Sequence, residues 1–379
     1  MTEGPEAPPY GTSTLAEVLP SAAGLLGVSG FTDTLGLADL VRDSGERAPS
    51  AVTVLLVDGL GWWPWRDSTE ITPTLAAMAQ RRLSTTVPST TPTALASLGT
   101  GLPPGAHGIV GAAFRLPEDG AILHPLSWSG GPHPVATQPE PTIFERVARA
   151  GVPVLSVGAS AYAESGLTRA VLRGGSYSGA DDAPTMIDAI AGHGQGLGYA
   201  YVSDLDRAGH VYGVDSAQWR DALRAVEELV ARLLDALGSD HLLLVTADHG
   251  MVDCPDESHV SIESLPEFGQ VLTVAGEPRL RHVYCRAGQS DRLVTLWREE
   301  LGERAHVLGR EEALAQGLFG ATEEDYADRV GDIVVMARGD TLLASEVDTF
   351  VSSLVGQHGS VTDAEMHIPL LAAWGSGRG

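Results

Sequence analysis

The chain has 379 residues, and its 24 lysine and arginine residues face 49 aspartates and glutamates, which gives a formal net charge of −25. It contains no lysine, so every one of those basic residues is arginine. The absence of lysine excludes a Schiff base with pyridoxal phosphate and a Walker A nucleotide-binding loop, because both need a lysine amine. The acidic balance argues against binding to nucleic-acid duplexes, since that depends on basic side chains that neutralise phosphates.

Cysteine content and terminal composition indicate the compartment. The two cysteines, Cys254 and Cys285, do not form a disulfide framework and suit a reducing environment. The segment 1–20 is acidic and carries no basic region, so we expect no signal peptide. No apolar run is long enough for a membrane span. We therefore expect a cytoplasmic protein without a membrane partner, and its oligomeric state stays open.

The first 245 residues alternate short apolar runs with helical patterns. Strands are predicted at 52–57, 152–157, 199–202 and 242–245, and helices at 72–83, 142–150 and 216–237, with a glycine-rich loop at 166–184. Continuous apolar strands that alternate with helices are typical of a parallel sheet covered on both faces. We expect an α/β fold in which a mostly parallel, doubly wound sheet is sandwiched by helices.

The pattern changes after Glu277. Strands are predicted at 282–285 and 332–337, and helices at 291–301 and 310–318. We interpret this segment as a small α+β insert or cap subdomain. The predicted division is a metal-binding catalytic domain made of residues 1–276 and 346–379, with the insert at residues 277–345.

Acidic and histidine residues follow three of the predicted strands. Asp58 comes directly after the first strand, and Asp248 and His249 follow the strand at 242–245. Asp206 and His210 follow the strand at 199–202, and their spacing of four residues places both on one face of a helix. Ligands bind at the carboxyl ends of such strands. Each motif alone is more often a helix cap, a turn or a solvated face, but three together predict a metal site for Zn²⁺, Mn²⁺ or Fe.

A threonine-rich segment offers a nucleophile. Thr91 is followed by Pro92, which fits an N-cap residue and then proline at the first helical position. A helix N-terminus suits a phosphate group, because its N–H groups are free and its dipole is positive there. A hydroxyl becomes a useful nucleophile when a metal lowers its pKa. The alternative is that Thr91 only caps the helix.

Together these segments resemble the alkaline phosphatase superfamily, most closely its type I phosphodiesterase/nucleotide pyrophosphatase branch. The resemblance covers roughly residues 50–275 and 345–375. It depends on six motifs: Val57-Asp58-Gly59, Thr91 with Thr100-Gly101 nine residues later, His107-Gly108-Ile109-Val110, Asp206-x-x-Gly209-His210, Thr246-Ala247-Asp248-His249-Gly250-Met251, and His358-Gly359. Their order and spacing are much more specific than any one of them.

The resemblance implies two divalent metal ions, commonly zinc, with manganese or iron as alternatives. Carried over by position, the ligands of one ion are Asp58, Asp248, His249 and the Thr91 oxygen. Those of the other ion are Asp206, His210 and His358. The resemblance also implies that Thr91 attacks phosphorus and forms a phosphothreonine intermediate.

Several positions stay open. Thr90 is the rival nucleophile, and His367 competes with His358 as the last ligand. The family often has an asparagine, a donor to a phosphate oxygen, where this chain has Ala112. The N–H of Thr93 or an arginine is a candidate replacement.

Other residues are candidate structural or substrate contacts. His107 is expected to make a structural turn contact. Trp62 and Trp63, with Trp65 nearby, either stack on a base or aryl leaving group or pack the sheet edge. Further candidate substrate contacts are Arg115, Arg281 and His282.

The sequence therefore predicts a two-metal hydrolase of small phosphate esters, with a phosphodiester or a nucleotide pyrophosphate as substrate. Alternatives that use the same metal centre are a phosphomonoesterase and a phosphonate (C–P) hydrolase. A metal-binding protein without turnover is a further alternative.

Overall fold

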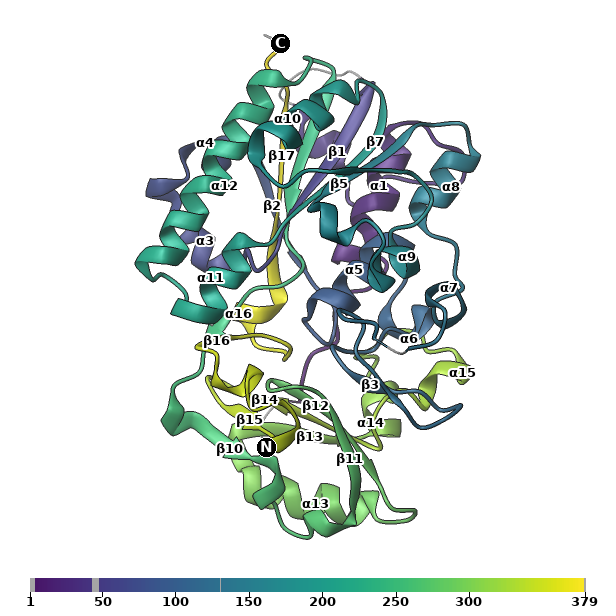
Figure 1. Ribbon diagram of the computed structural model, residues 1–379, viewed down its shortest axis with the longest axis vertical. Helices are drawn as coiled ribbons and strands as arrows, with labels where there is room; N and C mark the ends of the chain where they lie inside the picture. The colour runs from purple at the N-terminus through teal and green to yellow at the C-terminus, as the bar shows by residue number, and fades with distance from the viewer. Residues whose placement is uncertain (1–3, 43–47, 130, 378–379) are drawn as a thin grey trace.

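A seven-stranded sheet forms the centre of the computed structural model, which describes residues 4–42, 48–129 and 131–377 (Figure 1). Its strand order is β2-β17-β8-β1-β7-β5-β6, and β17 is antiparallel to both of its neighbours. The strands are β1 Ala51–Val57, β2 Ala79–Ser84, β5 Val154–Gly158, β6 Ser176–Gly179, β7 Gly196–Val202, β8 His241–Thr246 and β17 His367–Trp374. The predicted mostly parallel α/β sheet is confirmed, and its four predicted strands are β1, β5, β7 and β8.

Helices cover both faces of this sheet. Figure 1 shows α3, α4, α10, α11 and α12 on one side and α1, α5, α8 and α9 on the other. None of the helices in the described ranges combines the length and apolar character needed to cross a bilayer. The helices are α1 Val18–Leu25, α2 Leu37–Leu40, α3 Trp62–Arg66, α4 Pro73–Ala77, α5 Thr91–Thr100, α6 Pro104–His107, α7 Pro134–Thr137, α8 Ile143–Arg149, α9 Gly166–Val171, α10 Ala183–Gly192, α11 Asp204–Tyr212, α12 Ala217–Ala236, α13 Ser290–Leu301, α14 Arg310–Ala315, α15 Glu324–Ala327 and α16 Asp363–Met366.

Burial explains the two-sided covering of the sheet. Every residue of β1 and of β8 is buried, so both faces of these strands need apolar partners. Helix α12 supplies part of that cover, because its apolar stripe at Leu223, Val226 and Val230 is buried while its other face is solvated.

Two predicted segments differ from the structure. The helix expected at 72–83 is the short helix α4 followed by strand β2, because residues 79–84 pair with β17. This pairing overrides a local pattern that suited a helix. The glycine-rich segment 166–184 is not a loop, since it contains α9, β6 and the start of α10.

A second sheet lies at the lower end of the molecule in Figure 1. It has its own apolar core, which includes Val283, Trp297 and Val335. The sheet begins six residues before the predicted boundary at Glu277. The division into a catalytic domain and an insert stays a prediction. The ends of the predicted catalytic domain, residues 1–3 and 378–379, lie outside the described residues. Its strand order is β11-β12-β14-β13, with β11 Val271–Glu277, β12 Leu280–Cys285, β13 Ala305–Gly309 and β14 Ile333–Ala337.

A buried ion pair joins the two sheets. Arg279, between β11 and β12, donates to Glu365 through Nε at 3.0 Å and Nη2 at 2.9 Å. Both side chains are fully buried. Glu365 lies in α16, just before β17, and also accepts from the backbone N–H of Ser360. The bidentate geometry is the kind that makes an arginine–carboxylate pair strong.

Candidate metal centre and active site

Three neighbouring strands deliver the acidic residues to one edge of the central sheet. Strand β1 pairs in parallel with β7 and with β8, so their carboxyl ends lie side by side. Asp58 follows β1, and Asp248 and His249 follow β8. Asp206 and His210 lie in α11, which begins two residues after β7 ends. The parallel topology therefore brings together motifs that are almost 200 residues apart in the sequence.

Gly59 allows the turn after β1 to pass close to α11. Its φ is +74°, and a Cβ atom there would lie 3.0 Å from the Cα and Cβ atoms of Asp206. Its backbone N–H donates to Oδ1 of Asp248 at 3.2 Å. Glycine is needed for both reasons, since other residues disfavour this backbone conformation and would collide with Asp206.

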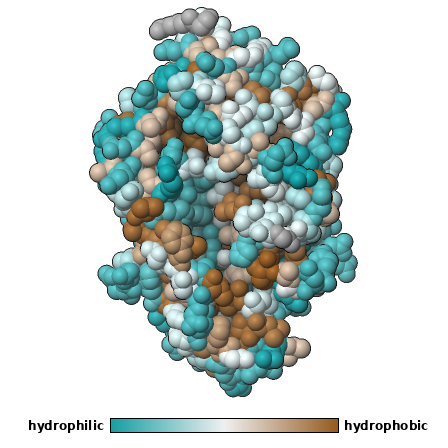
Figure 2. Space-filling view, in the orientation of Figure 1, coloured by the Kyte–Doolittle hydropathy of each residue, from teal (hydrophilic) through white to brown (hydrophobic). Residues whose placement is uncertain are grey.

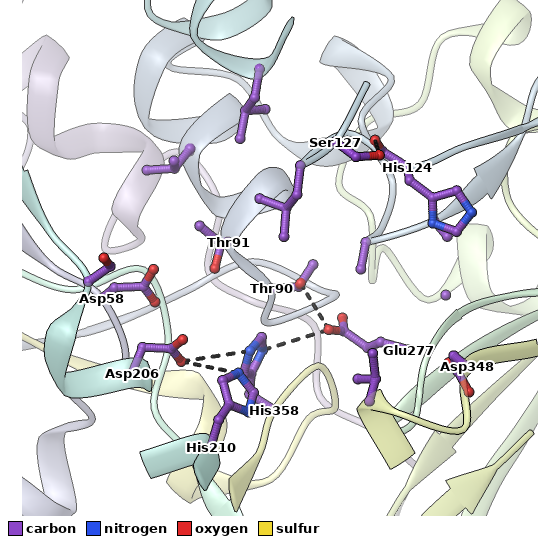
Figure 3. Close-up of a pocket in the computed structure, with 18 of the residues that line it drawn as sticks. Asp58, Thr90, Thr91, His124, Ser127, Asp206, His210, Glu277, Asp348 and His358 are labelled. Carbon is purple, nitrogen blue, oxygen red and sulfur yellow. Dashed lines mark hydrogen bonds and ion pairs between the residues drawn. The ribbon is translucent and has the colours of Figure 1, made fainter. Parts of the chain in front are cut away.

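The candidate ligands form two groups. Asp58, Asp248 and His249 form one, and Asp206, His210 and His358 form the other; in each group the ligand atoms lie within 4.8 Å of one another. Nε2 of His249 is 3.4 Å from Oδ1 of Asp58, and Nε2 of His210 is 3.4 Å from Oδ1 of Asp206. Figure 3 shows Asp206, His210 and His358 pointing toward one another. Their competitor His367 lies elsewhere, at the start of β17, where it accepts from Nε1 of Trp63.

Backbone carbonyls orient the three histidines. The Nδ1 atoms of His210, His249 and His358 lie 2.7, 3.0 and 3.0 Å from the carbonyl oxygens of Gly356, Gly250 and Ser89, respectively. A carbonyl accepts only, so these contacts assign the proton to Nδ1 and leave the Nε2 lone pair for a metal. This outer arrangement is typical of histidines that bind metals.

The carboxylates carry unpaired oxygens. Oδ1 of Asp58, Oδ1 of Asp206 and Oδ2 of Asp248 are buried without a hydrogen-bond partner. Burial raises the pKa of Asp58 well above its usual range, and the charges of Asp248 and Asp206 add to the effect. Burial also raises the pKa of Asp206, although His210 and His249 oppose the shift. Buried carboxylates crowded in this way need cations, so the oxygen and nitrogen donors fit divalent metals.

Thr91 lies beside the first ligand group. Its Oγ1 atom is 3.2 Å from Nε2 of His249. Helix α5 begins at Thr91, with Thr90 as its N-cap residue. The expectation was Thr91 as the N-cap and Pro92 as the first helical residue, so the helix begins one residue earlier than predicted. The Thr90 side chain makes no capping hydrogen bond. Pro92 has no N–H and the N–H of Ala94 bonds the carbonyl of Thr90, so Thr91 and Thr93 carry the N–H groups that this turn can offer to a phosphate oxygen.

Two further residues at this site, Glu277 and Tyr201, were not among the predicted ones. Glu277 accepts a hydrogen bond from Oγ1 of Thr90 at 3.0 Å, and burial raises its pKa well above the usual range even though that bond lowers it. Tyr201 donates its hydroxyl to Oδ2 of Asp58. A sequence signal existed for Tyr201, because it ends an alternation with Tyr199 just before the Asp206 motif. Glu277 offered none, since it lies 187 residues from Thr90.

The ligand groups open into a cavity of about 950 Å³. Some of the remaining candidate substrate contacts line this cavity and others do not. Ala112 lines it, so the position where the family often has asparagine offers no donor. Arg281 lines it too, but its guanidinium is bound to Asp348 and to the carbonyl of Leu343. Thr93 is buried with an unpartnered Oγ1 and is not part of the lining.

Three further residues singled out in the sequence also lie outside the cavity lining. His107 makes the expected structural contact, since its Nε2 lies 2.9 Å from Oγ of Ser97. Arg115 and His282 are not part of the cavity lining, and the ring of His282 bonds the backbone at both nitrogens.

The tryptophans lie outside the cavity lining, which favours the alternative that they pack against the sheet edge. Trp62 packs edge-on against Trp65 at 5.4 Å, and Trp63 packs edge-on against His367 at 6.1 Å. Helix α3 lies against β17 and α16, so it presents these rings to the sheet edge.

Comparison with known proteins decides the family. Residues 52–360 match the family model described as type I phosphodiesterase / nucleotide pyrophosphatase. The chain belongs to this family. The resemblance that the motifs predicted is therefore confirmed.

Solved structures of the superfamily share the fold of this phosphodiesterase family member. Murine ectonucleotide pyrophosphatase / phosphodiesterase 5 superposes with a TM-score of 0.68 at 20% identity, covering 85% of this chain and 87% of that chain. Phosphonoacetate hydrolase from Sinorhizobium meliloti 1021, in complex with phosphonoformate, gives 0.67 at 20% identity, covering 86% and 90%.

A curated relative matches over a shorter stretch. Phosphopentomutase from Anaeromyxobacter dehalogenans (strain 2CP-C) is 31% identical over 132 residues, which are 34% of this chain and 32% of that protein. The match thus spans about a third of the relative's length.

Proposed function

We propose that the protein hydrolyses phosphodiesters or nucleotide pyrophosphates, using two divalent metal ions and Thr91 as the nucleophile. Zn²⁺ is the proposed metal. The observation that carries the proposal is the position of the Thr91 hydroxyl, 3.2 Å from His249 in one ligand group and at the start of α5. A nucleophile, a phosphate-binding helix end and two sets of metal ligands therefore converge on one cavity.

The two ligand groups divide the work of holding the ions. Asp58, Asp248 and His249, with the Thr91 oxygen, would hold one ion. Asp206, His210 and His358 would hold the other. When bound, the ions supply positive charge that lowers the pKa of the attacking hydroxyl and stabilises the leaving oxygen.

Thr91 carries the covalent chemistry. Its Oγ1 forms a bond to phosphorus, and the hydroxyl proton leaves to solvent. The bond from phosphorus to the leaving oxygen breaks, and the alcohol or phosphate departs with the electron pair. A water molecule then forms a bond to phosphorus, the bond to Oγ1 breaks, and Thr91 regains a proton. Throughout, the first N–H groups of α5 hold a non-bridging phosphate oxygen.

A comparison of substrates with and without metal tests this function. The purified protein is stripped with a chelator, reloaded with Zn²⁺, Mn²⁺ or Fe²⁺, and assayed with bis-p-nitrophenyl phosphate, p-nitrophenyl thymidine phosphate and p-nitrophenyl phosphate. We expect no turnover after stripping, recovery with metal, and higher kcat/KM for the diesters than for the monoester. A strong preference for the monoester would contradict the diesterase assignment, and full activity in the stripped protein would contradict the metal mechanism.

A further inference from the structure

The cavity beside Thr91 is lined mainly by apolar and aromatic side chains. They come from both sides of the site: from α5 and α9, from the central sheet, and from β11 with the segment that follows β15 (Leu342–Ala344). A large share of apolar lining is typical of sites that bind an apolar group, although His124 and Ser127 add polar side chains away from the ligand groups (Figure 3). The large apolar and aromatic lining residues are Leu95, Ile122, Leu126, Val157, Tyr162, Leu167, Leu172, Tyr177, Tyr199, Tyr201, Val274, Val347, Phe350, Val351 and Leu354.

Part of this lining is exposed at the cavity mouth. The exposed fractions are 61% for Leu126, 66% for Val347 and 76% for Phe350. In Figure 2 hydrophobic surface borders the hollow on this face of the molecule. Large apolar side chains gathered in this way around one opening indicate a binding surface, because exposing contiguous apolar surface to water is unfavourable.

Positive charge is scarce in the same cavity. Among the described residues that line it, the arginines are Arg207 and Arg281. Arg207 pairs with Asp204 at 2.5 Å. Arg281 is fully buried and paired with Asp348 at 2.5 Å. The buried Arg281 guanidinium is therefore not available to a second or third phosphate group of a substrate, and Arg207 lies on the solvent-exposed surface of α11.

The two further acidic side chains of the lining leave no cation over. Asp348 balances Arg281, Glu277 bonds Thr90, and the chain has no lysine. A substrate with charges beyond its reacting phosphate would therefore find, among the described lining residues, no buried cation that is not already paired. Such an arrangement costs free energy in a partly desolvated site.

We propose that this site selects phosphodiesters that carry a single negative charge and an extended apolar alcohol group, alkyl or aryl. This inference rests on the proposed function and narrows its substrate class. The phosphate lies at Thr91 and the start of α5. The apolar group extends along the lining toward Leu126 and Phe350 and covers their exposed side chains.

A series of alkyl p-nitrophenyl phosphates tests the proposal, because the leaving group and charge stay constant while the alkyl group changes. The metal-loaded protein is assayed with the methyl, butyl and octyl diesters below their micelle concentrations. We expect kcat/KM to rise at least ten-fold from the methyl to the octyl diester. The change should come mainly from a lower KM, because the alkyl group of the substrate is bound equally in the ground and transition states. Equal kcat/KM across the series would overturn the inference and leave the proposed function standing. Failure to hydrolyse any member would overturn both.

Two matched substitutions locate the effect. Leu126→Asp places a charge at the cavity mouth, and Leu272→Asp places the same charge on an equally exposed leucine, at 57%, outside the lining. We expect the octyl-to-methyl ratio of kcat/KM to fall at least five-fold in Leu126→Asp and to stay unchanged in Leu272→Asp. An unchanged ratio in Leu126→Asp, or an equal fall in both variants, would overturn the inference.

A charged competitor completes the test. A dinucleoside pyrophosphate carries more negative charge than the octyl diester and a less apolar body. We expect its kcat/KM to be at least ten-fold lower than that of the octyl diester. A higher value for the dinucleotide would overturn the inference and would support the nucleotide pyrophosphatase form of the proposed function.

Discussion

The hydroxyl of Thr90 donates a 3.0 Å hydrogen bond to Oε2 of Glu277. The next residue, Thr91, has its hydroxyl 3.2 Å from Nε2 of His249 instead. Two adjacent threonines at the start of α5 therefore have different surroundings: one bonds a carboxyl group of the second sheet, and the other faces the ligand groups of the central sheet.

This difference predicts unequal effects of alanine substitution. Thr91→Ala removes the nucleophile and should lower kcat for bis-p-nitrophenyl phosphate by on the order of 1000-fold or more. Thr90→Ala should lower it by less than about 10-fold, since a hydrogen bond of this kind is worth about 0.5–1.5 kcal/mol. Steady-state kinetics on both metal-loaded variants, with mass spectrometry of acid-quenched wild-type protein, check the assignment. A phosphorylated peptide at Thr90, with an active Thr91→Ala, would reverse it.

The histidine assignment can be tested by metal content. We expect about two divalent ions per wild-type chain by analogy with the two ligand groups. His358→Ala should bind about one, because it removes a ligand from the group of Asp206 and His210. His367→Ala is the matched control and should bind as many as wild type. Elemental analysis after equilibrium dialysis gives the counts, and equal loss in both variants would show that His358 is not a specific ligand.

Bound metal should also stabilise the fold. A ligand that binds only the folded state at about 100 times its Kd adds about 2.7 kcal/mol to the free energy of unfolding. We expect the Tm of wild type to rise on adding Zn²⁺ and the rise to be smaller in His358→Ala. Thermal unfolding at a fixed free-metal concentration measures both. A Tm that does not respond to any divalent metal would contradict the two-metal assignment.

Local patterns predicted the parts of the molecule that depend on local sequence. Consecutive apolar residues identified the buried strands β1 and β8, and a helical repeat identified the apolar stripe of α12. The position of Asp58 at the end of a strand followed from the first of these patterns. β2 was not predictable in this way, because Ala79–Ser84 becomes a strand only by pairing with β17, almost 300 residues later. The roles of Trp63 and Glu277 likewise depend on distant partners, His367 and Thr90.

The buried pair Arg279–Glu365 should be costly to break. Glu365→Gln leaves the Arg279 charge fully buried without its counter-ion, and we expect a loss of about 3–5 kcal/mol in the free energy of unfolding. Glu312→Gln breaks the half-exposed pair with Arg298 and should cost no more than about 1 kcal/mol. Urea unfolding of both variants, stripped of metal, provides the comparison. Equal losses would show that burial does not set the strength of the first pair.

His107 should contribute to acid sensitivity. Burial lowers its pKa from 6.5 to about 3, and the charge of Arg329 acts in the same direction. The unfolded chain therefore binds a proton at this residue between pH 6.5 and about 3, where the folded protein does not. The stabilisation is present above pH 6.5 and is lost as the pH falls toward 3, with a slope of up to about 1.4 kcal/mol per pH unit.

The substitution His107→Gln removes this titration and should flatten the pH dependence. We expect the unfolding free energy of the chelator-treated variant to fall less steeply than that of wild type between pH 6.5 and 4.5. Urea titrations at several pH values measure the two slopes. Parallel curves would show that His107 binds its proton equally in both states.

The buried ion pair between Arg279 and Glu365 also limits how far the two sheets can separate. Swinging the smaller sheet away would break two charge-assisted hydrogen bonds at once, so a hinged opening at this point is disfavoured. We therefore expect the two sheets to keep their relative orientation when a substrate binds.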